Sequence, residues 1–400
     1  MTHKKDIRLI EYKTKVFPRN EIPNEMGELL WKNYNNYITV EFPSPKTEGQ
    51  WQLTSKGYVG YIPLTQDIGI NLQPKVSLDN LFRMLEYAYK LKFKFLEGVT
   101  NCESIKEFYE RLANILALKI IDRARKGFYR AYISEDADLS YLRGRLNLAQ
   151  IARTPWEIKL PCHYEEHTAD IEENQILAWT LSRIIGSGIC SGRVLHNIRE
   201  AYRSLRGAVS LKPFTPKDCI ELIYNRLNDD YRPIHALCRF FLEHSGPSHK
   251  IGEHTMIPFV INMERLYELF VAEWLKKNLP RDLSLSIQEK VDIGERGKIS
   301  FRIDLVINDV HTGDTICVLD TKYKISEKPD TDDVAKVVAY AEMKGCKVAV
   351  LIYPKHLDMP IDDNIGNIRV KSTTFLVDGD LEQQGRIFLK NLYKSNIIPK

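Results

Sequence analysis

Two aspartates in the last third of the chain have a spacing that can support chemistry. Asp304 and Asp320 lie eight residues before and eight residues after Thr312. Residues 311–314 (HTGD) are typical of a turn, and an antiparallel hairpin that turns there brings the two aspartates opposite each other, with Cβ atoms about 4.5–5.5 Å apart. Strand alternation then places Lys322 on the same face of the sheet as Asp320.

The chemistry open to this set is metal-assisted hydrolysis of a phosphodiester. Two facing carboxylates repel each other, and a hard divalent cation such as Mg²⁺, or Mn²⁺ in its place, relieves the repulsion by taking oxygen ligands. The candidate ligands are Asp304, Asp320 and the main-chain carbonyl of Thr321. A bound metal polarises a phosphoryl oxygen and activates a water molecule. Lys322 can orient or deprotonate that water, or stabilise negative charge that develops on the phosphate.

A D-x-K tripeptide is weak evidence by itself. With 53 acidic and 57 basic residues among 400, about seven or eight acidic-x-basic matches are expected by chance, and most such residues lie on solvated faces. The alternative interpretation is a surface hairpin in which Asp304 and Lys322 form a salt bridge. The apolar residues 316–319 lead directly into Asp320, which favours a buried strand and therefore a functional site.

The elements around these residues predict an αβββαβ order, which is the core architecture of restriction-endonuclease-like nucleases of the PD-(D/E)xK type. The three strands form a meander, and the strand–helix–strand link that follows is a crossover, which predicts a parallel strand pair. The expected elements are helix 262–275, strands 285–291, 300–307 and 315–323, helix 331–344 ended by Gly345, and strands 347–353 and 368–377.

The whole chain is expected to be an α+β protein of three domains. Residues 1–97 predict a β-rich domain, residues 98–254 a mainly helical domain, and residues 255–400 the α/β nuclease domain. A helix over 78–91 is expected to be capped by Asp79 or Asn80, and residues 243–253 are expected to form a loop at the second boundary. The other expected elements are strands 36–42, 58–62 and 68–72 and helices 108–126, 174–185 and 194–205.

The composition is that of a folded protein in a reducing compartment. The chain has 400 residues, 44% of them hydrophobic, and a formal net charge of +4, which is compatible with a nucleic-acid partner. Its seven cysteines are widely spread and form no C-x-x-C pair, which argues against disulfides or a zinc cluster and favours a cytoplasmic location. The N-terminus is polar and no run of about 18 apolar residues occurs, so neither a signal peptide nor a membrane partner is expected.

With Asp304 and Asp320-Thr321-Lys322 in this order of elements, the chain resembles the McrC family, the nuclease subunits of McrBC methylcytosine-dependent restriction systems. The resemblance covers essentially the whole chain, and the further matching stretches are 57–63 (GYVGYIP), 74–89 (PKVSLDNLFRMLEYAY) and 262–275 (NMERLYELFVAEWL). It implies a Mg²⁺-dependent endonuclease that cuts double-stranded DNA. It also implies a partner, McrB, an AAA+ GTPase ring that recognises modified cytosine and translocates DNA. The part of the chain before the nuclease domain is then expected to dock into this ring and stimulate GTP hydrolysis.

Asp304, Asp320 and Lys322 match the family motif directly, and two further positions are considered with them. Glu268, on the helix before the strands, looks like the glutamate that such nucleases often carry there, or is a solvated helix-face residue. The helix after D-x-K usually begins D-x-x-Q-x-x-A-Y in the family, but here Lys336 takes the place of the glutamine. A lysine cannot accept a hydrogen bond, although it can contact phosphate. A catalytically inactive regulator of the GTPase therefore stays open as an alternative. A stand-alone DNA repair nuclease that uses the same site without McrB is a separate alternative.

A basic stretch in the middle region is a candidate for nucleic-acid binding. Its candidate residues are Arg125, Lys126, Arg130, Arg143 and Arg145. They can track a phosphate backbone or dock an acidic partner, or form an ordinary solvated face. Nearby, His163, His167 and Asp170 have a metal-type spacing for a helix, but we expect them in a loop that leads into a helix. No G-x-x-x-x-G-K-[ST] pattern occurs, so the chain itself is not expected to hydrolyse GTP.

Overall fold

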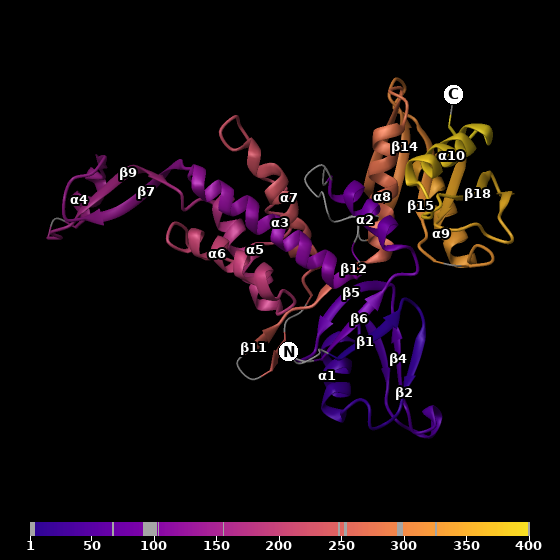
Figure 1. Cartoon of the computed structure of the whole chain (residues 1–400). Helices are drawn as coiled ribbons and strands as arrows, with labels where there is room; N and C mark the ends of the chain where they lie inside the picture. The colour runs from indigo at the N-terminus through magenta and orange to yellow at the C-terminus, as the bar shows by residue number, and fades with distance from the viewer. Residues whose placement is uncertain are drawn as a thin grey trace. The chain divides into compact units, whose positions relative to one another are not determined.

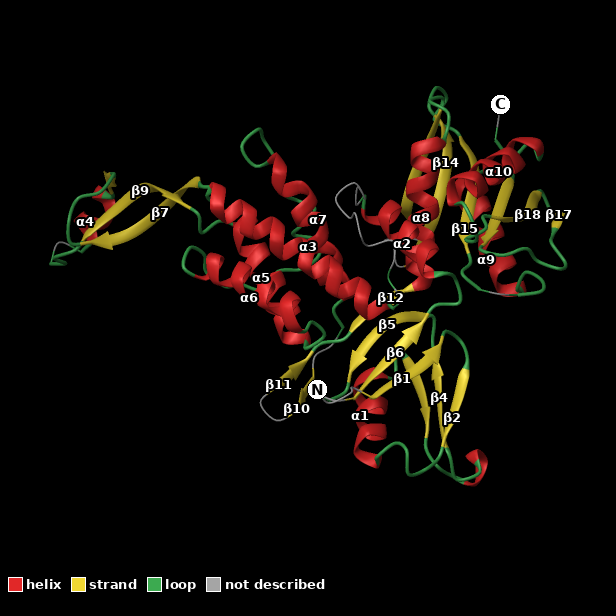
Figure 2. Cartoon of the chain, in the orientation of Figure 1, coloured by secondary structure: helices red, strands yellow, loops and turns green. Residues whose placement is uncertain are grey.

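The computed structural model shows a mixed α+β protein with several separate sheets (Figures 1 and 2). It describes residues 5–65, 68–90, 102, 104–154, 156–246, 249–251, 254–293, 299–324 and 326–398. The chain forms two compact units, one made of Met1–Ile105 with Val260–Lys400 and the other of Lys106–Phe259. Within the described ranges, no helix is both long enough and apolar enough to cross a membrane.

The N-terminal part of the first unit is built on two small sheets. Their strand orders are β1-β6-β5-β12 and β2-β4-β3. The side chain of Trp51 is fully buried at the centre of this part, and Gly27 lets a helix approach it, because a Cβ at Gly27 would lie 2.2 Å from the Trp51 ring. The elements are β1 (Lys5–Ile10), β2 (Thr14–Phe17), α1 (Asn24–Tyr34), β3 (Ile38–Glu41), η1 (Pro45–Thr47), β4 (Trp51–Ser55), β5 (Tyr58–Pro63), β6 (Ile68–Gln73), α2 (Leu78–Tyr89) and β12 (Phe259–Asn262).

Two details of this part differ from the sequence prediction. The helix α1 (Asn24–Tyr34) is absent from the prediction, which assigned no element to these residues. The helix predicted over 78–91 is present as α2, but Asp79 and Asn80 already lie in its first turn and neither caps it. The cap is Ser77, whose backbone is extended and whose hydroxyl accepts a hydrogen bond from the Asn80 N–H at 3.3 Å.

The C-terminal part of the first unit is a six-stranded sheet with the order β13-β14-β15-β16-β18-β17. Strands β13 to β15 pair antiparallel, whereas β15 with β16 and β16 with β18 pair parallel. The elements are α8 (Met263–Asn278), β13 (Leu283–Ile293), β14 (Ile299–Asp309), β15 (Thr315–Thr321), α9 (Thr331–Lys344), β16 (Val348–Tyr353), β17 (Asp362–Ile365), β18 (Ile368–Thr374) and α10 (Leu381–Lys394).

The predicted succession of helix, three-stranded meander, helix and strand is present from α8 to β16, and the predicted parallel pair is β15 with β16. The helix α9 has the predicted bounds. The Asp330 carboxylate caps its start by accepting a hydrogen bond from the Asp332 N–H, and Gly345 ends it in the left-handed region at φ 66°. Its buried residues Val337 and Ala341 pack into the same core as the strands, which fixes α9 against the sheet.

The second unit combines helices with a three-stranded sheet of order β7-β9-β8. In this unit the small sheet and α4 lie at the end away from α5 and α6 (Figure 1). The elements are α3 (Ile105–Lys126), β7 (Ala131–Leu139), β8 (Arg145–Leu146), α4 (Leu148–Arg153), β9 (Leu160–Thr168), α5 (Glu172–Ser187), α6 (Gly192–Arg206), η3 (Asp229–Tyr231), α7 (Arg232–His244), β10 (His249–Ile251) and β11 (His254–Met256).

The helices predicted in this region are present as α3, α5 and α6, but the small strands were missed. Residues 243–253, predicted as a loop, contribute β10 to a hairpin with β11. His163 and His167, predicted in a loop, lie on β9, where four residues span about 13 Å and a shared metal ion is out of reach. His163 instead contacts Asp136 on β7 at 2.9 Å.

Candidate active site

The β14–β15 hairpin sets two aspartates opposite each other. Leu305 pairs with Leu319 in the antiparallel ladder, and in this register the next position places Asp304 opposite Asp320. The Asp320 side chain is fully buried. Asp304 Oδ2 accepts hydrogen bonds from the Thr321 N–H at 3.2 Å and from the Thr321 hydroxyl at 3.3 Å. This is the register that the symmetric spacing in the sequence predicts.

Two lysines hold the carboxylate of Asp320 between them. Lys322 Nζ lies 2.5 Å from Asp320 Oδ2, and Lys336 Nζ on α9 lies 3.2 Å from Asp320 Oδ1. The Lys322 side chain is only 15% exposed. Burial would lower the pKa of Lys322, but the charge of Asp320 raises it above its ordinary value. The alternative of a surface hairpin with an Asp304–Lys322 salt bridge is therefore wrong, because Lys322 pairs with a fully buried carboxylate instead.

A further acid, Asp333, was not singled out as a site residue from the sequence. It lies in the first turn of α9, where Lys322 Nζ is 3.2 Å from its Oδ1, and it also forms a short ion pair with Lys324. Burial alone would raise the pKa of Asp333, but these two lysines lower it below its ordinary value. The Lys322 ammonium thus contacts Asp333 as well as Asp320. Its signal in the sequence is an acid in the first turn of the helix that follows D-x-K.

Glu268 on α8 lies within electrostatic reach of both aspartates. It accepts a short hydrogen bond from the Gln288 amide on β13. Burial, and after it the negative charges of Asp304 and Asp320, raise the pKa of Glu268 to about 7. Its side chain is therefore directed toward the sheet and is not a freely solvated helix-face group.

The donor set fits a hard divalent cation. Burial and then the charge of Asp320 raise the pKa of Asp304, so carboxylates crowd one another here. Thr321, whose carbonyl is a candidate ligand, ends β15 beside Asp304. In the described ranges no three His, Cys, Asp or Glu side chains are grouped to hold a metal. Two carboxylates and a main-chain carbonyl could supply oxygen ligands of the kind that Mg²⁺ prefers, and water and substrate oxygens would supply the rest.

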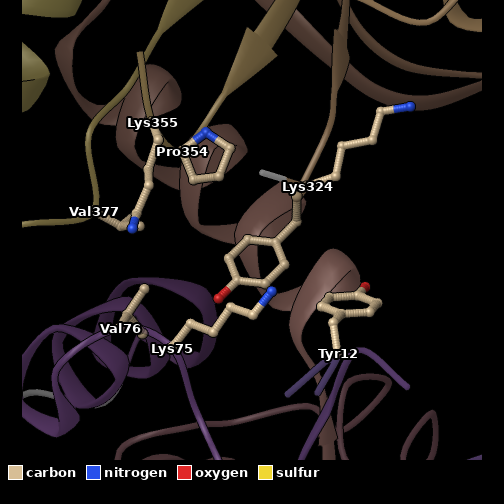
Figure 3. A pocket seen from close by; sticks show the side chains of 8 residues that line it. Tyr12, Lys75, Val76, Lys324, Pro354, Lys355 and Val377 are labelled. Carbon is tan, nitrogen blue, oxygen red and sulfur yellow. The ribbon is translucent and has the colours of Figure 1, made fainter. Parts of the chain in front are cut away.

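Tyr323, which directly follows Lys322, connects the site to the N-terminal part of the same unit. Its hydroxyl donates a hydrogen bond to Glu11 Oε2 at 3.3 Å, and the Lys75 N–H donates to the same oxygen at 3.3 Å. A pocket beside these groups is lined from both parts of the unit, with Tyr12 and Lys75 on one side and Pro354, Lys355 and Val377 on the other (Figure 3).

Replacing Glu11 by glutamine is expected to change stability in a pH-dependent way. Burial raises the pKa of Glu11 from 4.5 to about 7, so the native state holds the proton more tightly than the unfolded chain. The contribution of the protonated Glu11 side chain to the free energy of unfolding is fully present below about pH 4.5 and is lost as pH rises through about 7. The loss amounts to at most about 3 kcal/mol. We therefore expect Glu11→Gln to melt higher than wild type at about pH 8 and close to it at about pH 5. Thermal melting at both pH values checks this, with exposed Glu28→Gln as the control, and an equal gap at both would contradict it.

The basic residues predicted to bind nucleic acid lie in the second unit, and two of them are already paired. Lys126 forms an ion pair with Asp122 at 2.7 Å, and Arg143 lies 3.6 Å from Glu166 and over the Tyr164 ring. The remaining three are exposed and lie on different elements: Arg125 near the end of α3, Arg130 before β7, and Arg145 on β8. The five candidates thus lie at the end of α3, before β7, and on or just before β8.

Comparisons with known proteins relate the chain to one family. A family model described as the McrBC 5-methylcytosine restriction system component matches residues 53–354. Among curated proteins, none matches the sequence. A half-complex of Thermococcus gammatolerans McrB AAA+ hexamers with bound McrC contains a chain of similar fold, with 17% identity, a TM-score of 0.56, and coverage of 97% of this chain and 100% of that one. A structure of the Thermococcus gammatolerans McrBC complex gives 18% identity, a TM-score of 0.44, and coverage of 69% and 89%.

Proposed function

The chain belongs to the McrBC family of 5-methylcytosine restriction system components, and from this premise we propose that it is the DNA-cutting subunit of such a system. In this proposal it is a Mg²⁺-dependent endonuclease with a PD-(D/E)xK site. Asp304 and Asp320 hold the metal with the Thr321 carbonyl, Lys322 acts on the reacting groups, and Glu268 and Lys336 adjust the site. The substrate is double-stranded DNA, and the partner is a McrB-like AAA+ GTPase ring.

The observation that carries this proposal is the pair of facing aspartates with Lys322 beside them. A buried carboxylate needs a compensating charge, and the ammonium groups of Lys322 and Lys336 contact the fully buried Asp320. A bound divalent cation would supply Lewis-acid activation of the phosphate and of a water molecule. Lys322 then stands where its ammonium can stabilise charge on the phosphate or orient the water, and Asp333 keeps it in place.

The proposed partner follows from the family and from the surface of the second unit. The solved complex with the similar fold contains McrB AAA+ hexamers with bound McrC. In this chain, large apolar side chains are exposed around the β7–β9–β8 sheet and α4, and such a surface is typical of a protein interface. These exposed residues are Tyr132, Tyr141, Leu142, Leu148, Trp156 and Ile158. We therefore assign docking on the GTPase ring to this end of the second unit.

Plasmid cleavage tests the proposal as a whole. The purified chain is incubated with supercoiled methylated DNA and Mg²⁺, with and without the partner GTPase and GTP, and with EDTA as the control. Cutting that needs metal, partner and GTP together supports the proposal. Cutting without the partner would favour a stand-alone nuclease, and no cutting while the partner's GTP hydrolysis is still stimulated would favour an inactive regulator.

One observation favours the regulator as the second candidate. Lys336 Nζ on α9 lies 3.2 Å from Asp320 Oδ1, where its positive charge competes with a metal ion for that carboxylate. Burial alone would lower the pKa of Lys336, but the negative charge of Asp320 raises it above its ordinary value. The Lys336 ammonium therefore keeps its charge. If the pair never opens, the fold serves the partner GTPase without cutting DNA.

Replacing Lys336 by glutamine is expected to strengthen metal binding by about tenfold, since it removes a competing charge that is 43% exposed and hence partly screened. Calorimetric titration with Mg²⁺ or Mn²⁺ measures the affinity of wild type and variant. Lys344→Gln is the matched control, because Lys344 lies on the same helix and is paired with Glu289 at 2.6 Å. Equal affinities for wild type and Lys336→Gln would show that Lys336 does not compete with the metal.

A further inference from the structure

The helix α6 of the second unit carries a row of basic side chains along one face. His196, Arg199, Arg203 and Arg206 follow each other at spacings of three, four and three residues, which places them on one side of a helix. The opposite side holds Ile198, Ala201 and Leu205, which are buried, and α6 packs against α5. We call the exposed row, together with Arg193 and Tyr202, the α6 basic face.

The stability of the helix does not account for this row. Glu200 is the sole acid of α6, and none of its arginines forms an ion pair within the described residues. Like charges three or four residues apart destabilise a helix. Arg203 and Arg206 gain from the helix dipole in the last turn, but Arg193 lies in the first turn, where a cation is unfavourable. An anionic ligand would offset these repulsions.

The character of the surface points to nucleic acid as this ligand. Protein interfaces have an apolar centre from which charged residues are depleted, whereas nucleic-acid interfaces are polar and strongly positive. None of the exposed large hydrophobic residues found in the described part of the chain lies on α6. Arg199, Tyr202 and Arg203 lie with His196 along one open, shallow side of α6, so these cations face solvent on a surface that a nucleic-acid backbone can reach.

We propose that the α6 basic face binds the phosphate backbone of DNA. The proposal deepens the proposed function, since it assigns a DNA contact outside the cutting site. It also replaces the sequence-based candidates Lys126 and Arg143, whose charges are already paired, as the first choice for this contact. Such contacts fix the position of the DNA and carry no sequence information.

The test is the salt dependence of DNA binding, measured by fluorescence anisotropy with the full chain in EDTA, so that no cutting occurs. The variant is Arg199→Gln/Arg203→Gln/Arg206→Gln. The control is Lys46→Gln/Arg232→Gln/Lys277→Gln, which removes the same charge at exposed, ion-paired positions. A duplex and a single strand of equal length are both used, because the slope per phosphate contact is about −0.9 for duplex and about −0.7 for single-stranded DNA.

The expected result is a loss of affinity of more than about tenfold at 0.1 M salt for the α6 variant, with a duplex slope shallower by about two to three. The control keeps the wild-type slope, and Arg199→Lys/Arg203→Lys/Arg206→Lys restores most of the affinity. The proposal is overturned if the α6 variant binds DNA as wild type does, including the case in which stimulation of the partner GTPase falls instead. If wild type itself binds no DNA, the proposed DNA substrate fails together with this inference.

Discussion

Asparagine in place of Asp304 or Asp320 is expected to lower the rate of DNA cleavage by at least about 10³-fold, because metal activation of the phosphate is worth several kcal/mol. Asparagine keeps the size of the side chain, and at position 304 its carbonyl can still accept the Thr321 hydrogen bonds. Single-turnover cleavage measures the effect, and calorimetry should show weaker metal binding in the same variants.

The control for this prediction is Asp314→Asn, which alters an exposed aspartate in the turn of the same hairpin. Stimulation of the partner GTPase should stay at the wild-type level in all three variants, which shows that they are folded and able to dock. Cleavage within about threefold of wild type after either Asp304→Asn or Asp320→Asn would remove that residue from the site.

Alanine in place of Lys322 is the second large effect, with an expected loss of about 10²- to 10⁴-fold in the cleavage step. Lys322 contacts Asp320 and Asp333 through its ammonium, so its removal leaves the reacting phosphate without this charge. Metal affinity should not fall, since a cation near Asp320 is lost. The measurement is the single-turnover rate of cleavage at saturating Mg²⁺, which should be lower for Lys322→Ala than for wild type.

Lys324→Ala is the matched control for Lys322, because Lys324 also pairs with Asp333 but is more exposed, at 36% against 15%. It should keep most of the activity. Equal losses in the two variants would mean that general disturbance of the Asp333 pairs, and not a direct role of Lys322, explains the effect.

The register of the site could be predicted because it depends on local geometry. The equal spacing of Asp304 and Asp320 about a turn sequence fixes their pairing, and the structure places them in it. Strand alternation likewise predicted that Lys322 lies on the same face of the sheet as Asp320, and the two side chains are paired. The crossover to β16 and the bounds of α9 followed from apolar periodicity and a terminal glycine.

Contacts between distant segments could not be predicted from the sequence. Lys336 could be identified as an unusual residue, but only the packing of α9 on the sheet shows that it reaches Asp320. Glu11 and Tyr323 are 312 residues apart, and no local pattern connects them. Strand β7 is a different case: Ala131, Ile133, Ala137 and Leu139 are half-buried and the residues between them are exposed, so its alternation could have been read from the sequence.

The most direct test of the account is whether the two facing carboxylates share one divalent cation. Crystals of the chain soaked in Mn²⁺, which stands in for Mg²⁺, give an anomalous difference map that locates the metal. We expect one peak within ligand distance of both Asp304 and Asp320, with the Lys336 ammonium moved away from Asp320. No peak at this position, with Lys336 still paired to Asp320 at saturating Mn²⁺, would contradict it.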